Sequence, residues 1–183
     1  MTTHRCLSAR PLALGLLLTL AGTPALAGTY SVTSTADTNT AGTLRYAIDQ
    51  ANANPGSTIN LQSSLGTITL GSMLPLLNAS VTINGNGNTV SGGNQYRVFF
   101  AQQGTVSLNN LTIANGKAQG GNGGLSAGGG AGLGGGLFVN AAKVQLSGVQ
   151  FTDNGAAGGS GGIFSGHAGG GGFYAAGGNG GGG

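Results

Sequence analysis

The chain has 183 residues, of which 41 are glycine and only 5% are charged. Its six basic and three acidic residues form no cluster or stripe that could neutralise a phosphate backbone, which argues against a nucleic-acid partner. Low charge combined with regularly spaced Val, Ile, Leu and Thr differs from the composition of disordered chains and favours an ordered chain up to about Asn115, whereas the Gly tracts beyond it do not.

Residues 1–27 are predicted to be a secretory signal peptide. Arg5 and Arg10 precede a short apolar run, Leu12–Leu20, and the small residues Ala25 and Ala27 follow in the Ala-x-Ala order that a signal peptidase recognises. We therefore expect cleavage after Ala27. The alternative, a membrane anchor, is disfavoured because the apolar run is too short to span a bilayer.

Processing would change both the cysteine content and the charge balance. Cys6 would leave with the signal peptide, so the mature chain would contain no cysteine for a disulfide or a metal site. The remaining charges would be nearly balanced: Arg45, Arg97, Lys117 and Lys143 against Asp37, Asp49 and Asp153.

The first predicted elements of the mature chain are a strand and a helix. Thr29–Thr33 alternates as a strand does. Within Thr43–Asn54, apolar residues recur at helical spacing (Leu44, Ala47, Ile48 and Ala51). Thr43 can act as the N-cap, and Asn54-Pro55-Gly56 ends the run. A helix at this place predicts a cap over the exposed first coil of a β stack.

Short β runs separated by Gly, Asn and Pro follow the helix. They are Thr58–Leu61, Thr67–Leu70, Ser80–Ile83, Thr89–Val90, Arg97–Phe100, Thr105–Leu108 and Leu111–Ile113. Their length and spacing suit the coils of a β-helix and also an antiparallel sandwich. The nearest hairpin signal, Asn84-Gly85-Asn86-Gly87, is longer than an ideal two-residue turn.

A sequence repeat favours the β-helix over the sandwich. Val106–Ile113 superposes on Val144–Phe151 with the same internal spacing. A recurring unit that cannot bury its apolar face alone indicates a stacked solenoid. We therefore expect Val144, Leu146 and Phe151 to point into the same core as Val106, Leu108 and Ile113, one or more turns apart.

Glycine tracts dominate the chain from residue 116. They predict a Gly-rich insertion at residues 116–136 in a β-helix domain at residues 28–154, followed by a Gly-rich, incomplete repeat region at residues 155–183. A Gly-Gly-apolar-aromatic element recurs as Gly135–Phe138, Gly161–Phe164 and Gly171–Tyr174. Because no Val-x-Leu strand follows the last copy, we expect the chain to be an N-terminal piece of a longer protein, most mobile from Gly155 onward.

Two sequence features resemble a known group of bacterial surface proteins. Val32–Asp37 with Gly42–Gly56 looks like the opening segment of many surface β-helix proteins. The Gly-Gly-apolar-aromatic element and Phe151-x-x-Asn154 look like repeats of the autotransporter-passenger and polymorphic outer-membrane protein group. The resemblance implies a right-handed parallel β-helix, an all-β solenoid displayed on a Gram-negative outer surface. In autotransporters a C-terminal barrel exports the passenger, so outer-membrane contact would need a part that this sequence does not contain.

No residue stands out as catalytic, cofactor-binding or metal-ligating. The three mature carboxylates, Asp37, Asp49 and Asp153, lie far apart in sequence, whereas polysaccharide lyases and hydrolases need them clustered. His167 near Ser165 has no visible orienting acid. The Gly tracts place Leu125 and Gly182 where a calcium repeat needs Asp.

Asparagines at predicted turns receive a structural interpretation. Asn side chains tolerate left-handed corners, bond to local backbone and form ladders when they stack in successive coils. The residues concerned are Asn84, Asn109, Asn115, Asn140 and Asn154.

The functional expectation is a non-enzymatic, adhesin-like surface passenger. It would be exported to the cell surface, the outer membrane or the extracellular space, and would bind a host or neighbouring-cell surface or a polysaccharide through an extended surface. Two alternatives stay open: a carbohydrate-active β-helix enzyme, and a self-associating Gly-rich structural protein.

Overall fold

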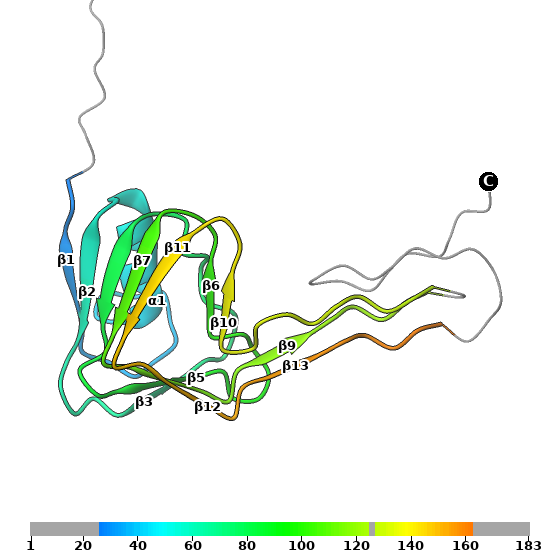
Figure 1. The fold of residues 1–183 in the computed structure, drawn as a ribbon. Coiled ribbons are helices and arrows are strands. Elements are labelled where there is room, and N and C mark those ends of the chain that lie inside the picture. The colour runs from blue at the N-terminus through cyan, green and yellow to red at the C-terminus, as the bar shows by residue number, and fades with distance from the viewer. Residues whose placement is uncertain (1–25, 125–126, 163–183) are drawn as a thin grey trace, which may run out of the picture.

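Residues 26–124 and 127–162 are described by the computed structural model and form a parallel β-helix from which a glycine-rich arm projects (Figure 1). Every strand pairing in the described residues is parallel. After each coil the chain returns to the same sheet one level further along, so neighbouring strands are distant in sequence. The predicted parallel β-helix is confirmed, and the antiparallel sandwich is excluded.

Four sheets make up the described structure. The main sheet contains, in spatial order, β1 (Thr29–Val32), β2 (Ser57–Leu61), β4 (Val81–Asn84), β7 (Thr105–Asn109) and β11 (Lys143–Ser147). The second contains β3 (Thr67–Thr69), β5 (Thr89–Ser91), β8 (Thr112–Ala114) and β12 (Gln150–Thr152). Two smaller sheets pair β6 (Phe99–Ala101) with β10 (Leu137–Val139), and β9 (Lys117–Gln119) with β13 (Gly155–Ala157).

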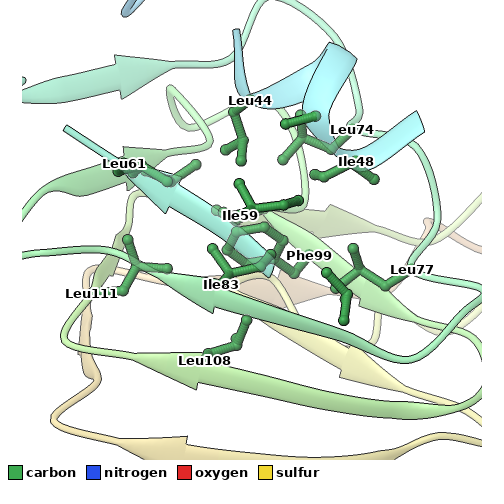
Figure 2. Close-up of a cluster of buried hydrophobic side chains, with 14 of the residues drawn as sticks. Leu44, Ile48, Ile59, Leu61, Leu74, Leu77, Ile83, Phe99, Leu108 and Leu111 are labelled. Carbon is green, nitrogen blue, oxygen red and sulfur yellow. The ribbon is translucent and has the colours of Figure 1, made fainter. Parts of the chain in front are cut away.

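The core consists of apolar columns that run through successive coils. Ile59, Ile83 and Leu108 are register partners in the main sheet and have no exposed surface. Ile68, Val90 and Ile113 form the equivalent column in the second sheet. Each fully buried side chain of this kind contributes about 1.5–3 kcal/mol. Figure 2 shows Phe99 lying beside Ile59 and Ile83 in the same cluster.

The strand alternation in the sequence accounts for these columns. In a strand, successive side chains point to opposite faces, so the apolar residues of Val81-Thr-Ile-Asn84 enter the core and the polar ones face out. The burial pattern of β2 and β4 follows this alternation from end to end.

The helix α1 (Leu44–Ala53) packs on β1 and β2 at the start of the stack. Its first turn is fixed by Thr43, whose Oγ1 accepts a hydrogen bond from the Tyr46 backbone N–H at 3.4 Å. It buries the four residues that the helical spacing selected: Leu44, Ala47, Ile48 and Ala51. Leu44 and Ile48 lie over the core near Ile59 (Figure 2). The predicted capping helix is confirmed.

The sequence repeat is confirmed, because its two copies align residue by residue as paired strands. Val144 and Leu146 of β11 pair with Val106 and Leu108 of β7, and Phe151 of β12 pairs with Ile113 of β8. Their burial differs from the expectation. Leu146 and Phe151 are each 48% exposed, because in the described residues nothing pairs with the outer edges of β11 and β12.

The glycine arm comprises three legs: an outgoing leg (residues 117–124), a return leg (residues 127–136) and a second outgoing leg (residues 155–162). They run side by side away from the β-helix in Figure 1. Apart from β9 and β13 the legs are not β-strands. Backbone hydrogen bonds join all three: Gly120 N–H donates to Ala157, Gly130 N–H to Gly121, and Gly159 N–H to Gly130.

The hydrogen bonds of the arm advance in steps of three residues. Gly120 and Gly123 donate to the carbonyls of Ala157 and Ser160, at 2.9 and 2.8 Å. The second outgoing leg repeats the step, because Gly159 and Gly162 donate to Gly130 and Ala127. Three residues per turn is the period of the polyproline II helix, and in collagen only glycine fits the crowded axis of such a bundle.

Close backbone contact explains why these positions are glycine. A Cβ added at Gly129, Gly132 or Gly135 would overlap with the carbonyl oxygens of Gly159, Ala157 or Gly155 respectively. These three glycines are themselves three residues apart. The arm is therefore held together by main-chain contact in place of side-chain burial.

Candidate binding surface

The outer side of the main sheet carries two columns of uncharged polar side chains, which we call the polar face. One column contains Thr29, Thr58, Thr82, Ser107 and Gln145, and the other contains Ser31, Asn60, Asn84, Asn109 and Ser147. The members are half-buried or exposed. Because parallel strands lie about 4.8 Å apart, the face is a regular lattice of hydroxyl and amide groups.

A ladder of asparagine amides fixes the second column. Asn84 Nδ2 donates to Asn60 Oδ1 at 2.7 Å, and Asn109 Nδ2 donates to Asn84 Oδ1 at 2.9 Å. In the first column Ser107 Oγ donates to Gln145 Oε1 at 3.2 Å. These bonds hold the side chains in fixed positions, which lowers the entropy cost of binding a ligand across several coils.

The predicted ladder is confirmed for Asn84 and Asn109, and the other asparagines have different partners. Asn115 has a left-handed φ of 49° and donates to Ser91 Oγ. Asn154 bridges the Ile113 carbonyl and the Gly116 N–H. The backbone N–H of Asn140 donates to the Ala101 carbonyl at 2.9 Å.

Sequence reasoning missed Asn60, the first member of the ladder. The signal was present: Ser57-Thr-Ile-Asn60, Val81-Thr-Ile-Asn84 and Val106-Ser-Leu-Asn109 share one pattern of hydroxyl, aliphatic and Asn residues. It also missed Asn88, a buried corner residue whose amide bonds to the Gly66 N–H and to the carbonyls of Gln62 and Gly85.

The carboxylates have structural partners at separate places. Asp37 forms an ion pair with Arg45 at 2.7 Å and accepts hydrogen bonds from the N–H groups of Gly71 and Ser72. Asp49 accepts a hydrogen bond from Asn39. Asp153 occupies a left-handed corner with φ 53°. In the described residues no three His, Cys, Asp or Glu side chains lie close enough to hold a metal ion.

An apolar groove adjoins the side of the β-helix that contains β6. It has a volume of about 560 Å³ and its walls include Met73, Leu76 and Phe100. Arg97 lies against Phe100, with its guanidinium carbon 5.4 Å from the ring centre of Phe100 and 5.0 Å from that of Phe138. Arg97 also donates to the carbonyls of Leu133 and Gly134, so it ties the return leg of the arm to the β-helix.

Some predicted features lie outside the described residues. They are Ser165, His167, the two later Gly-Gly-apolar-aromatic elements from residue 163 onward, and nearly all of the predicted signal peptide. Gly28, the expected first residue of the mature chain, is described: its N–H donates to Ser57 Oγ at 2.8 Å. No helix in residues 26–124 and 127–162 is long and apolar enough to cross a membrane.

Comparison with known proteins gives no relative. No protein-family model, no curated protein and no solved structure matches this chain. The fold and the polar face are therefore inferred from the strand pairing and the contacts of this chain alone.

Proposed function

We propose that the protein is an exported surface passenger that binds in an adhesin-like manner through the polar face. The expected partner is a polysaccharide, or a host or neighbouring-cell surface that presents one. The observation that carries the proposal is the regular, uncharged lattice of hydroxyl and amide groups across five strands.

The chemistry of the face suits a neutral, hydroxyl-rich ligand. Hydroxyl and amide groups both donate and accept hydrogen bonds, so they can match sugar hydroxyls in either role. The two columns contain no ionisable group, but Lys143 lies on the same side of β11, two residues before Gln145, so one cation borders the face. Specificity would then depend mainly on the spacing of the hydroxyl and amide groups. A parallel β-helix offers that spacing over a length that a pocket does not, because each coil repeats the same positions.

Two observations on the chain's beginning agree with export. The signal-peptide pattern ends at Ala27. Gly28 follows it directly and is hydrogen-bonded to the β-helix: its N–H donates to Ser57 Oγ, and its carbonyl accepts from the Thr58 N–H. Cleavage at this point would leave the first strand intact.

A charge placed on the lattice tests the proposal. The unaltered mature protein and its Thr82→Lys variant are both assayed for binding to neutral polysaccharides. We expect the substitution to weaken binding at least tenfold, since the long cationic side chain would disrupt contacts on both columns. Thr89→Lys is the matched control, because Thr89 is also a half-buried strand threonine but belongs to the second sheet. Equal binding by all three proteins, or no binding to any glycan or cell surface, would refute the proposed function.

A further inference from the structure

A small cavity opens at the end of the polar face that β1 and β2 form. Its volume is about 320 Å³, and its walls include Ser31 of β1 and Asn60 of β2, two members of the second column of the face. The loop after β2 supplies Gln62 and Ser63, and the corner of the next coil supplies Asn86. The cavity is therefore continuous with the polar face, but it is recessed, so a ligand group can be enclosed on several sides.

Hydrogen bonds between neighbouring coils hold the walls of this cavity in place. The Gln62 N–H donates to the Val32 carbonyl at 2.8 Å, and the Gln62 carbonyl accepts from Nδ2 of the buried Asn88 at 2.8 Å. Asn86 has a left-handed φ of 48°, and its Nδ2 donates to the Leu61 carbonyl at 2.7 Å. The same stretch of backbone is thus tied to the coil before it and to the coil after it. A cavity built in this way is formed before a ligand arrives, which lowers the cost of binding.

The side chains around the cavity have hydrogen-bonding groups to spare. In the part of the chain that the structure describes, the hydroxyls of Ser31, Thr33 and Ser63 make no hydrogen bond. Among the same described residues, the side-chain amide of Gln62 has no partner either. The ladder uses only Oδ1 of Asn60, so its Nδ2 donors are also available. The lining of the cavity contains no ionisable side chain.

We propose that this cavity binds one neutral monosaccharide unit, the terminal residue of a glycan that lies along the polar face. The assignment rests on the proposed function for its class of ligand and adds a specificity site to it. Hydroxyl and amide groups match sugar hydroxyls as donors and as acceptors. A carboxylate, phosphate or amine would find no opposite charge in the lining, and removing it from water would be costly.

The size and place of the cavity narrow the ligand to a single terminal unit. Small-molecule sites span about 300–1,000 Å³, and a cavity at the lower end of this range suits one sugar ring better than an oligosaccharide. β1 is the outermost strand of the main sheet in the described residues, so the cavity lies at one end of the lattice. A glycan bound across the coils would reach it with its last residue.

Titration of the full mature chain with single sugars tests the inference. The probes are the neutral methyl glycosides of glucose, galactose, mannose and N-acetylglucosamine, and the readout is the NMR shift of backbone amides. With at least one of them we expect saturable shifts at Gln62, Ser63 and Asn86 and none at Gln145, on the far side of the lattice. Gln62→Ala should weaken this binding about tenfold, because it removes hydrogen bonds to the sugar.

Gln95→Ala is the matched control for this variant. Gln95 is also an exposed loop glutamine whose side chain makes no hydrogen bond within the described residues, but it is not part of the cavity lining. It should bind the glycoside as the unaltered protein does. Equal weakening by both variants, or by neither, would show that the sugar is not held in this cavity.

The same titration separates this inference from the proposed function. If none of the four glycosides shifts the cavity amides while polysaccharides still bind the unaltered protein, the cavity assignment is wrong and the polar face stands. If a glycoside shifts them and Gln62→Ala weakens its binding, the cavity assignment holds. It would hold even where Thr82→Lys leaves polysaccharide binding unchanged, a result that refutes the lattice alone.

Discussion

Successive coils are held together by opposite means in the β-helix and in the glycine arm. In the β-helix, Leu108 and Ile113 are fully buried, and the coils are joined by strands whose inner side chains fill a core. In the arm, Gly129 and Gly132 leave no room for a side chain, and the coils are joined by main-chain contact. A substitution to alanine therefore removes packing in one region and introduces overlap in the other.

The largest expected effect tests the core by comparing two members of one column. Leu108→Ala should destabilise the protein by about 2–5 kcal/mol, because a fully buried leucine leaves a cavity. Leu146→Ala, one coil further along, should cost only about 1 kcal/mol because that side chain is half exposed. Denaturant unfolding of the mature chain measures both. Equal losses would show that the last coil is covered as fully as the one before it.

The asparagine ladder should have an intermediate effect. Asn84→Ala removes the bonds to both Asn60 and Asn109, and the expected loss is about 1–2 kcal/mol for two partly exposed hydrogen bonds. Thr82→Ala in the same strand should change stability by only a few tenths of a kcal/mol, as expected for a surface position. The same unfolding experiment measures the free energy of unfolding of both variants. Equal values would show that the ladder does not stabilise the protein.

The arm should respond locally with little change in global stability. Gly132→Ala would overlap with the carbonyls of Ala157 and Ala118, so we expect faster exchange of the amides of Gly120 and Gly159. The unfolding midpoint should change little, since the arm buries few side chains. Gly128→Ala is the matched control because a Cβ there meets nothing within 4 Å. A large midpoint shift for Gly132→Ala would mean that the arm supports the core.

We expect the protein to show no polysaccharide-degrading activity. Purified mature protein should not degrade acidic or neutral polysaccharides, with or without Ca²⁺, since Asp37 is held by Arg45 and Asp49 by Asn39. Turnover that disappears on replacing Asp37, Asp49 or Asp153 would reverse this prediction and restore the enzyme alternative.

The elements that follow side-chain periodicity could be read from the sequence. The helix was visible in Leu44, Ala47, Ile48 and Ala51, and the coil register in the match of Val106–Ile113 with Val144–Phe151. Both depend on which side chains are apolar and how they are spaced.

The arm and most of the polar face could not be predicted from side-chain periodicity. A glycine tract does not reveal which glycines meet a neighbouring backbone, because Gly132 and Gly128 look alike in sequence although only Gly132 has no room for a Cβ. The ladder needed three aligned coils, and Asn60 was recognisable only beside Asn84 and Asn109. The exposure of Leu146 depends on what lies beyond the last coil, which the repeat itself does not contain.

The distance between the two ends of the polar face tests the stacked-coil account most directly. Thr29 and Gln145 are exposed, lie in one column and are separated by four strand steps. Spin labels at Thr29→Cys and Gln145→Cys, in a mature chain expected to contain no other cysteine, allow a pulsed electron-spin measurement. The account predicts a backbone separation of about 19 Å, from four steps of about 4.8 Å, broadened by the label linkers. A narrow distribution centred far beyond this value, on the order of 30 Å or more, would contradict the in-register stack.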